Sequence, residues 1–183
     1  SAQESALAAL PLLSRREHVS TVAGLFLFSW GGASAAGSTG SGMAAVANVI
    51  LACAQAGDHI IADDTVYGGT HYLLEDEIKY IGIEVTRVDA SRLETVEKAM
   101  KKNTRLILIE TPANPTLKLI DIAAVVKIAH QGKARVCVDN TFLTPFSQQP
   151  IEFGADIVLH SATKYIGGHG DVVAGVVVGH KEF

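Results

Sequence analysis

Lys164 and Asp139 are the two residues whose positions most strongly indicate chemistry. Lys164 ends the segment Ser161–Lys164, which follows an apolar run, 155–159, and precedes a cluster of glycines. Asp139 directly follows another strand-like run, 135–138. If both runs are core strands, an amine and a carboxylate lie at the carboxyl ends of strands, where open α/β sheets place their sites. Pyridoxal phosphate needs these two groups, because a lysine forms a Schiff base with its aldehyde and an aspartate keeps its pyridine nitrogen protonated.

Simpler interpretations of these residues stay open at this point. Lys164 alone is compatible with a surface lysine in a turn. Asp139 is harder to explain, because a carboxylate at the end of a buried strand is desolvated and needs a compensating cation. His160 and His169 flank the lysine, but the spacing offers no third metal ligand, so we expect no metal site and, for both histidines, roles in supporting the site residues or the fold.

Composition favours one α/β enzyme domain in the cytoplasm. The chain has 183 residues, of which 48% are hydrophobic and 19% charged, and its 17 glycines indicate many tight turns. The net charge of −4 gives no reason to expect nucleic-acid binding. Cys53 and Cys137 stand in apolar runs and are predicted to be buried thiols of a reducing compartment. No apolar stretch reaches the roughly 20 residues of a membrane helix, so a membrane is not an expected partner either.

From Ile60 onward, strand-like runs alternate with helical patterns. One helix is predicted after Ser91–Glu94, which has the spacing of a capping box, and another over Ile122–Ala129, whose apolar residues recur at helical intervals. Strands that are apolar on both faces predict a mainly parallel sheet with helices on both faces, which is a three-layer α/β fold. The predicted strands are 60–62, 83–88, 105–110, 135–138, 157–160 and 172–178.

Residues 31–42, expected to form a loop, lead into an apolar helix that begins at Ser41–Met43. The N–H groups of such a helix start form an anion site that suits a phosphate group. Two alternatives compete with this interpretation. Gly40–Ala45 also matches a dinucleotide-binding pattern, with Asp63 placed for a ribose contact, although no clear strand leads into its first glycine. That pattern would make the protein a nicotinamide oxidoreductase, whereas a plain linker before a core helix would carry no function.

Two further side chains follow the ends of predicted strands. Tyr67 stands beside Gly68 and Gly69, which leave room for its ring to lie flat on another ring. Asn114 lies between two prolines, which fix the backbone and direct its amide over the sheet edge. Each residue alone is equally compatible with an ordinary turn.

Five short motifs occur in order along the chain: Ser41–Met43, Val66–Thr70, Glu110–Thr116, Val138–Phe142 and His160–Gly170. Together they resemble the cysteine and methionine metabolism family of pyridoxal phosphate enzymes, which contains cystathionine γ-synthase, cystathionine lyases, methionine γ-lyase and O-acetylhomoserine sulfhydrylase. The resemblance covers Gly31–Phe183. It implies the large domain of the aspartate-aminotransferase fold, also called fold type I.

The resemblance implies a role for each matching residue. Lys164 would carry the cofactor and shuttle protons, and Asp139 would keep the ring nitrogen protonated. Tyr67 would stack on the ring and assist departure of the leaving group, and Asn114 would face the phenolic oxygen. The phosphate group would be held by Ser41, Gly42 and Met43 at the helix start and by the hydroxyls of Ser161 and Thr163.

The resemblance also implies a reaction. Family members eliminate the γ-substituent of a sulfur amino acid, giving 2-oxobutyrate, ammonia and a thiol, or replace it with a thiol nucleophile. We expect elimination on methionine, cystathionine or homocysteine. Methionine γ-lyases typically carry cysteine where this chain has Gly69, which counts against a strict methionine γ-lyase.

The same resemblance implies an assembly and a division into domains. Family members are tetramers built from two close dimers, so we expect a homo-oligomer. Residues 41–183 are assigned to the cofactor-binding domain and residues 1–40 to a segment without a clear counterpart. A C-terminal small domain is expected to be absent. If the chain were instead a noncatalytic remnant of the family, it would bind without turnover.

Overall fold

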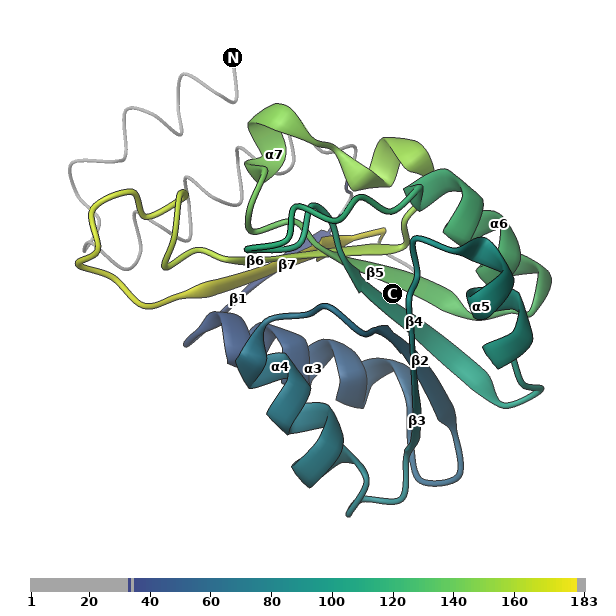
Figure 1. The fold of residues 1–183 in the computed structure, drawn as a ribbon. Helices are drawn as coiled ribbons and strands as arrows, with labels where there is room; N and C mark the ends of the chain where they lie inside the picture. The colour runs from purple at the N-terminus through teal and green to yellow at the C-terminus, as the bar shows by residue number, and fades with distance from the viewer. Residues whose placement is uncertain (1–32, 34, 181–183) are drawn as a thin grey trace.

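A seven-stranded sheet forms the centre of the molecule. The computed structural model describes residue 33 and residues 35–180. The strands lie side by side in the order β1-β7-β6-β5-β4-β2-β3 (Figure 1). Their bounds are β1 Ala35–Thr39, β2 His59–Asp63, β3 Glu84–Val88, β4 Thr104–Glu110, β5 Arg135–Asp139, β6 Ile157–Ser161 and β7 Gly175–Gly179.

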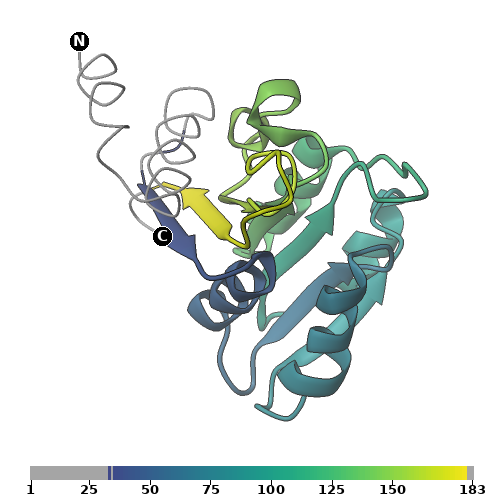
Figure 2. The same ribbon diagram turned by 90° about the vertical axis from the view of Figure 1, so that its left-hand side faces the viewer.

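All of these strands except β7 run in the same direction. β2 pairs in parallel with β3 and β4, and parallel pairing continues through β5 to β6. β7 is antiparallel to both of its neighbours, β6 and β1. Figure 2 shows β1 (purple) and β7 (yellow) side by side at one edge of the sheet. The carboxyl ends of the other strands therefore share one edge, which is where parallel α/β sheets bind ligands.

Helices cover both faces of the sheet (Figure 1). α3 (Gly42–Cys53), α4 (Gly68–Tyr72) and its continuation η2 (Leu73–Ile78) lie on one face. α5 (Leu93–Ala99) and α6 (Ile122–Gln131) lie on the other face, and the short helices α7 (Thr144–Ser147) and η3 (Pro150–Phe153) connect β5 to β6. The predicted three-layer, mainly parallel fold is confirmed. Among the described residues, no helix has the length and apolar character that crossing a bilayer requires.

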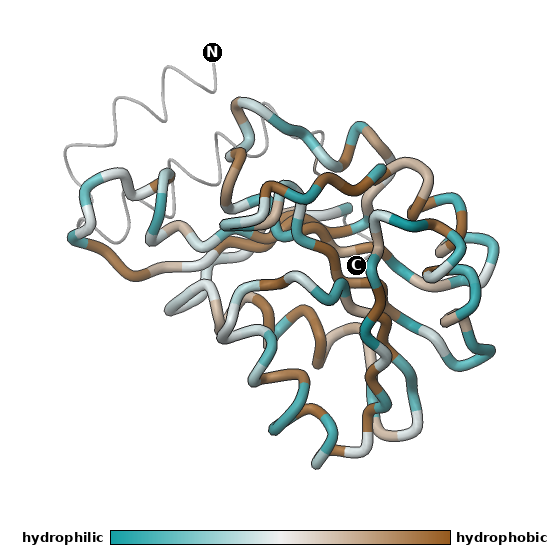
Figure 3. Tube along the Cα trace, viewed as in Figure 1, coloured by the Kyte–Doolittle hydropathy of each residue, from teal (hydrophilic) through white to brown (hydrophobic). Residues whose placement is uncertain are grey.

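The strands are apolar on both faces because both faces pack against helices. In β4, Leu106 and Leu108 belong to the cluster that includes α3, whereas Ile107 and Ile109 belong to the cluster that includes α5 and α6. All four side chains are at most 2% exposed. Figure 3 shows the hydrophobic strands at the centre and the more hydrophilic connections around them. Such double burial is typical of central strands in a parallel sheet.

Strand β1 corrects one prediction. Residues 31–42 were expected to form a loop, but Ala35–Thr39 pairs residue by residue with Gly175–Gly179. The run Ala-Ala-Gly-Ser-Thr contains mostly residues with a low intrinsic preference for strands. Its conformation is therefore imposed by its partner β7, and a strand does lead into Gly40.

The capping box predicted at Ser91–Glu94 is wrong. The Ser91 hydroxyl donates to Asp89 Oδ1 at 2.6 Å, and α5 begins without a side-chain cap. The next helix, α6, is capped instead, because Asp121 Oδ1 accepts a hydrogen bond from the Ala124 N–H at 3.0 Å. The apolar face predicted for α6 is buried against the sheet: Ile122, Val125, Val126 and Ala129.

Candidate active site

A large cavity of about 960 Å³ opens at the carboxyl edge of the sheet, beside the first turn of α3. A smaller hollow of about 280 Å³ lies between β1, α3 and β7, and no titratable side chain lines it. The large cavity is therefore the candidate active site. All nine residues predicted to bind a cofactor line it: Ser41, Gly42, Met43, Tyr67, Asn114, Asp139, Ser161, Thr163 and Lys164.

The start of α3 and the end of β6 form a tight corner of this cavity. The Ser41 side chain caps the helix by accepting a hydrogen bond from the Ala44 N–H at 3.0 Å. The N–H groups of Gly42 and Met43, in the first helical turn, lack an intrahelical acceptor and suit an anion. A Cβ on Gly42 would lie 2.6 Å from the Cβ of Ser161, which real contacts do not allow. Glycine thus lets the helix start approach the Ser161 side chain, and the corner between them, here called the cradle, suits an anion such as a phosphate group.

Asp139 ends β5 on the α3 side of the sheet, the side to which Cys137 also points. Its Oδ1 accepts hydrogen bonds from the Thr141 N–H at 3.0 Å and from the Thr141 hydroxyl at 2.5 Å. Burial raises the pKa of the Asp139 carboxyl, and the bonds from Thr141 oppose this rise without cancelling it. A cation against this carboxylate would be favoured, and a protonated pyridine ring is such a cation.

Thr141 is a site residue that the sequence analysis did not single out. Its hydroxyl donates to Asp139 and accepts from the Ser161 N–H at 2.8 Å. One side chain therefore joins the carboxyl ends of β5 and β6. The available signal was the Asp-Asn-Thr sequence, because an aspartate commonly accepts bonds from the residue two positions later.

Glu110 is a second residue that was missed. It pairs in register with Asp139 on the neighbouring strand, and both residues line the cavity. Burial, together with the charge of Asp139, raises the pKa of Glu110 to about 7. The sequence placed Glu110 within a motif, but no local pattern distinguished it from an ordinary glutamate at a strand end.

Tyr67 and Asn114 lie on separate loops that Glu110 holds together. The Glu110 Oε2 accepts a hydrogen bond from the Tyr67 N–H at 2.8 Å, and the Asn114 N–H bonds to the same carboxylate. Both side chains are exposed and line the cavity. A Cβ on Gly69 would lie 2.7 Å from Cε1 of Tyr67 and 2.8 Å from Sδ of Met43. The glycine therefore provides the space that the Tyr67 ring occupies, as expected.

Lys164 and Thr163 lie in the turn after β6. The Lys164 N–H donates to the Ser161 carbonyl at 3.1 Å, and the exposed Lys164 side chain lines the cavity. The Thr163 hydroxyl donates to the Ala174 carbonyl at 3.2 Å and accepts from the Ala174 N–H at 3.1 Å. Thr163 must therefore release the Ala174 carbonyl before it can donate to a phosphate group.

The two histidines near Lys164 lie outside the cavity lining. His160 is buried, and burial lowers its pKa to about 4, so it is neutral at physiological pH. His169 is exposed, and its Nδ1 lies 3.2 Å from the Gly167 carbonyl oxygen.

The dinucleotide alternative disagrees with the sheet order. β1 leads into Gly40 and β2 ends at Asp63, and between them lie β7, β6, β5 and β4. Five strand spacings of about 4.8 Å separate the two strands by roughly 24 Å, whereas the dinucleotide fold places them next to each other. Asp63 is also fully buried and bonded to Lys118.

The fold and the cavity are those of a pyridoxal phosphate (PLP)-dependent enzyme of fold type I. A lysine, a strand-end aspartate and the cradle at Gly42 line one cavity at the carboxyl edge of a mainly parallel sheet. The sequence profile described as "Cys/Met metabolism PLP-dependent enzyme" matches residues 27–183. The chain therefore belongs to this family.

Named relatives agree with this membership. An L-methionine gamma-lyase from Fusobacterium nucleatum subsp. polymorphum is 52% identical over 149 residues, which cover 81% of this chain and 38% of the relative. A cystathionine gamma-lyase from Bacillus subtilis (strain 168) is 52% identical over 138 residues, which cover 75% of this chain and 36% of the relative. The crystal structure of metB from Corynebacterium glutamicum superimposes with a TM-score of 0.86 and 42% identity over 90% of this chain and 43% of that one. The chain thus spans less than half the length of these proteins.

Proposed function

We propose that this chain is the cofactor-binding part of a PLP-dependent lyase that eliminates the γ-substituent of a sulfur amino acid. With water as the second reactant, the products would be 2-oxobutyrate, ammonia and a thiol. The observation that carries this proposal is that Lys164, Asp139 and the cradle at Gly42 line a single cavity. The two relatives described above as gamma-lyases, each 52% identical, support the reaction class.

The cavity offers a suitable group for each polar part of the cofactor. The first-turn amides of Gly42 and Met43, with the Ser161 hydroxyl, would hold the phosphate group. The Asp139 carboxylate would pair with the protonated ring nitrogen. This cation would stabilise the ionised form of Asp139, which burial disfavours. The Lys164 amine would bond to the aldehyde carbon, and the Asn114 amide would donate to the phenolic oxygen.

The cofactor, when bound, supplies an electron sink for the charge that develops at the substrate Cα. The side chains of the cavity would carry out the proton transfers. The Lys164 amine, freed when the substrate amine takes its place, would remove the proton from Cα and then one from Cβ, because a γ-substituent can leave only when negative charge develops at Cβ. Asp139 would stay ionised against the ring nitrogen and would keep that nitrogen protonated. The Tyr67 hydroxyl would protonate the departing sulfur, which makes the thiol a better leaving group.

Replacement of the γ-substituent by a thiol is the alternative reaction. It shares removal of the Cα proton by Lys164 and differs in which nucleophile completes the reaction. Gly69 bears on the choice of substrate, since any side chain there would contact both Tyr67 and Met43. Methionine, cystathionine, homocysteine and O-acetylhomoserine, each with and without an added thiol, would separate the two reactions by their products.

We further propose that the protein works in the cytoplasm as a homo-oligomer, a dimer of dimers, as the family resemblance implies. Exposed large apolar side chains support a contact surface, since Leu119 is 70% exposed and Phe146 is 69% exposed. Light scattering coupled to size-exclusion chromatography measures the assembly directly. A single monomeric peak at all concentrations would contradict the oligomer.

The test of the proposed function is covalent attachment of the cofactor at Lys164. The chain is incubated with pyridoxal phosphate, its absorbance spectrum is recorded, and borohydride is added before peptide mass spectrometry. We expect a new absorbance band that borohydride removes, with the reduced cofactor on the peptide that contains Lys164. The Lys164→Ala variant should show neither, whereas Lys127→Ala, an exposed lysine of α6, should behave as the wild type. Attachment elsewhere, or no attachment, would refute the proposal.

A further inference from the structure

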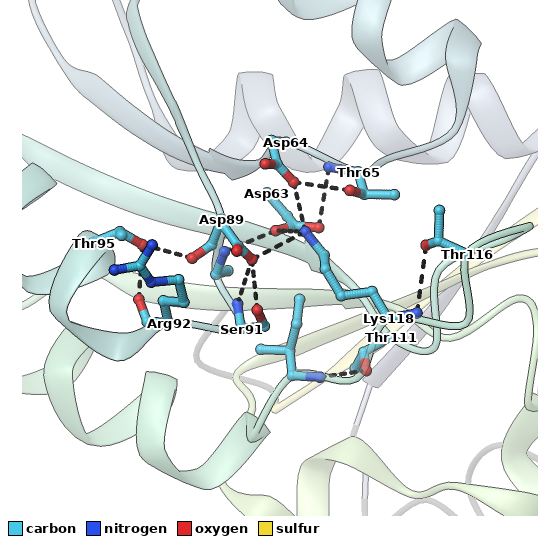
Figure 4. A network of polar contacts seen from close by, with 12 residues as sticks. Asp63, Asp64, Thr65, Asp89, Ser91, Arg92, Thr95, Thr111, Thr116 and Lys118 are labelled. Carbon is cyan, nitrogen blue, oxygen red and sulfur yellow. Dashed lines mark hydrogen bonds and ion pairs between the residues drawn. The ribbon is translucent and has the colours of Figure 1, made fainter.

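The Lys118 ammonium group lies among three carboxylates behind the wall of the cavity. Its Nζ is 2.8 Å from Asp63 Oδ1, 2.5 Å from Asp64 Oδ1 and 3.4 Å from Asp89 Oδ1. Figure 4 shows the lysine side chain reaching into this group from the segment after β4. Lys118 is not among the residues that line the cavity. Its side chain instead connects the segment after β4 with the end of β2.

The three carboxylates come from the ends of two strands at the carboxyl edge of the sheet. Asp63 ends β2, Asp64 begins the turn that leads to Tyr67, and Asp89 follows β3. Asp63 points to the α5 and α6 side of the sheet, because Ile61, two positions earlier, packs in that cluster. The ammonium group thus holds the end of β2 from the face opposite the cavity.

Charge and burial favour this arrangement. Asp63 is fully buried, and a buried carboxylate needs a cation or several hydrogen bonds. It receives both, since the Ala90 N–H donates to the same oxygen at 2.9 Å. Partial burial would lower the pKa of Lys118, but hydrogen bonds to Asp63 and Asp64 and the charges of both carboxylates raise it above its ordinary value. The lysine is therefore fully charged at physiological pH, and the network has a cation to hold it together.

The same three carboxylates lie close enough together to be considered as a metal site. The lysine ammonium, however, donates hydrogen bonds to all three of them. The cluster thus already contains its cation, and we assign it no metal.

Lys118 also closes the loop that carries Asn114. The Lys118 carbonyl accepts a hydrogen bond from the Ala113 N–H at 3.1 Å, and the Ile120 N–H donates to the Thr111 hydroxyl at 3.0 Å. The backbone of this loop is thus fixed next to Asn114, while the Lys118 side chain fixes it to the turn before Tyr67. On the cavity side, the Glu110 carboxylate accepts bonds from both loops. The two loops are therefore connected twice, by the Glu110 carboxylate on the cavity side of the sheet and by the Lys118 ammonium group on the opposite side.

We propose that Lys118 is a positioning residue of the active site, which sets the placement of Tyr67 and Asn114 against the cofactor by tying their loops together from behind. This proposal rests on the proposed function, because it presumes that both side chains contact pyridoxal phosphate. It adds a residue that lies outside the cavity and that none of the five motif roles includes. Loss of the ammonium group would leave Asp63 buried without its cation and would leave the two loops joined only through Glu110.

The first test is cofactor binding by Lys118→Met, which keeps the length of the side chain and removes its charge. The dissociation constant is measured by titrating the absorbance of bound pyridoxal phosphate. We expect affinity to fall by about tenfold or more, on the order of a 1.4 kcal/mol loss. Lys118→Arg, which keeps the charge, should stay within about threefold of the wild type. Lys101→Met is the matched control, since it removes an exposed ion pair with Glu84 at the other end of β3.

The second test needs no bound cofactor, so it separates this proposal from the proposed function. Amide hydrogen exchange is measured at Tyr67 and Ala113, whose N–H groups hold the two loops, with the His59 N–H as an internal reference. We expect Lys118→Met to speed exchange at both loop amides by about tenfold and to leave the His59 amide unchanged. Should Lys118→Met fail to fold, Asp64→Asn removes only the more exposed partner and should give the same pattern with a smaller change.

Two results would overturn the proposal. One is an unchanged exchange rate at Tyr67 and Ala113 in the variant that lacks the ammonium group. The other is a loss of affinity in Lys118→Met that Lys101→Met reproduces, since that would reflect general destabilisation. If the wild-type chain binds no cofactor but exchange accelerates at both loops, the proposed function fails while the connection made by Lys118 stands.

Discussion

At the scale of single residues, Glu110 and Asp139 are the two acidic side chains among those that line the cavity. They lie opposite each other on neighbouring strands, and each has a raised pKa. Burial is the first cause for both, and the charge of Asp139 adds to the effect on Glu110. Two carboxylates placed side by side without water favour protonation of one of them. The cavity thus holds an acid that gains or loses a proton near neutral pH.

The first prediction is a pH dependence of stability caused by Glu110. Its pKa is about 7 in the folded chain and near the ordinary value of 4.5 when unfolded, so the folded chain binds more protons between these values. The free energy of unfolding should therefore fall as the pH rises from about 4.5 to about 7, by roughly 1 to 3 kcal/mol, and then level off. Glu110→Gln should lack this decline in denaturant titrations of the cofactor-free chain.

The matched control for that prediction is Glu97→Gln, an exposed glutamate of α5. Burial of His160 produces the opposite trend, with stability lost as the pH falls from about 6.5 towards 4, so the difference between variants is the quantity to compare. The same slope in wild type and Glu110→Gln would show that Glu110 does not titrate in this window.

The second prediction concerns the cradle at Gly42. Gly42→Ala places a methyl group 2.6 Å from Ser161 Cβ and 3.1 Å from Ser161 Cα, so the helix start and the end of β6 must move apart. We expect a loss of about 1 to 3 kcal/mol in unfolding free energy and a weaker affinity for pyridoxal phosphate. Denaturant titration and absorbance titration measure the two effects. Gly40→Ala is the control, because a Cβ there meets nothing within 4 Å. Equal behaviour of both variants would argue against a close contact at Gly42.

At the scale of elements, the helix starts decide how well each helix is anchored. α6 has an aspartate cap at Asp121 and a buried apolar face, whereas α5 begins without a side-chain cap. α3 is capped by Ser41, and the same first turn forms the cradle of the cavity. A helix start thus serves stability in α6 and, in α3, both stability and the proposed binding of phosphate.

The third prediction tests the cap of α6. Asp121→Ala removes the hydrogen bond to the Ala124 N–H and should lower the unfolding free energy by about 1 kcal/mol. Asp121→Asn keeps an acceptor oxygen and should cost only a few tenths of that amount. Because α6 packs on the face opposite α3, cofactor affinity should not change in either variant. A change in affinity as large as the change in stability would show that the two faces are coupled.

At the scale of the whole molecule, one seven-stranded sheet joins the segments that carry the predicted site residues. The central strands β4 and β5 are buried on both faces, and Cys137 lies in the middle of β5 with no exposed surface. Cys53, in the last turn of α3, is half-buried. Access to the thiol of Cys137 therefore requires opening of the sheet itself.

The fourth prediction uses this thiol as a probe of global unfolding. Burial raises the pKa of Cys137 well above its ordinary value, and thiolate formation and access are both needed for reaction. In a Cys53→Ser variant, labelling of Cys137 by an aromatic disulfide should be negligible in native buffer. It should then rise with denaturant in step with the fraction of unfolded chain. Rapid stoichiometric labelling without denaturant would mean that β5 opens locally.

Several features of this protein follow from its sequence alone. Alternating apolar runs and helical patterns predicted a mainly parallel three-layer fold, because each strand is flanked by the helices that cover it. The positions of Lys164 and Asp139 after such runs predicted that both would face one edge of the sheet, since parallel strands end together. The glycines at 68 and 69 predicted room for the Tyr67 ring, whereas the close approach of Gly42 to Ser161 was seen only in the structure. These signals are local or periodic, so they can be recognised from residues that are close together in the sequence.

Other features were decided only by the tertiary structure. β1 has a weak strand sequence and exists because β7 pairs with it, and no neighbouring residue signals that partner. Glu110 becomes a group with a pKa near 7 only because Asp139 lies next to it on another strand. The three carboxylates that bind Lys118 lie at the ends of β2 and β3, from 29 to 55 positions away in the chain. Charge, burial and strand pairing depend on which distant segments fold together. The sequence therefore predicts where the active site lies, but not which residues set the pKa values and the loop positions there.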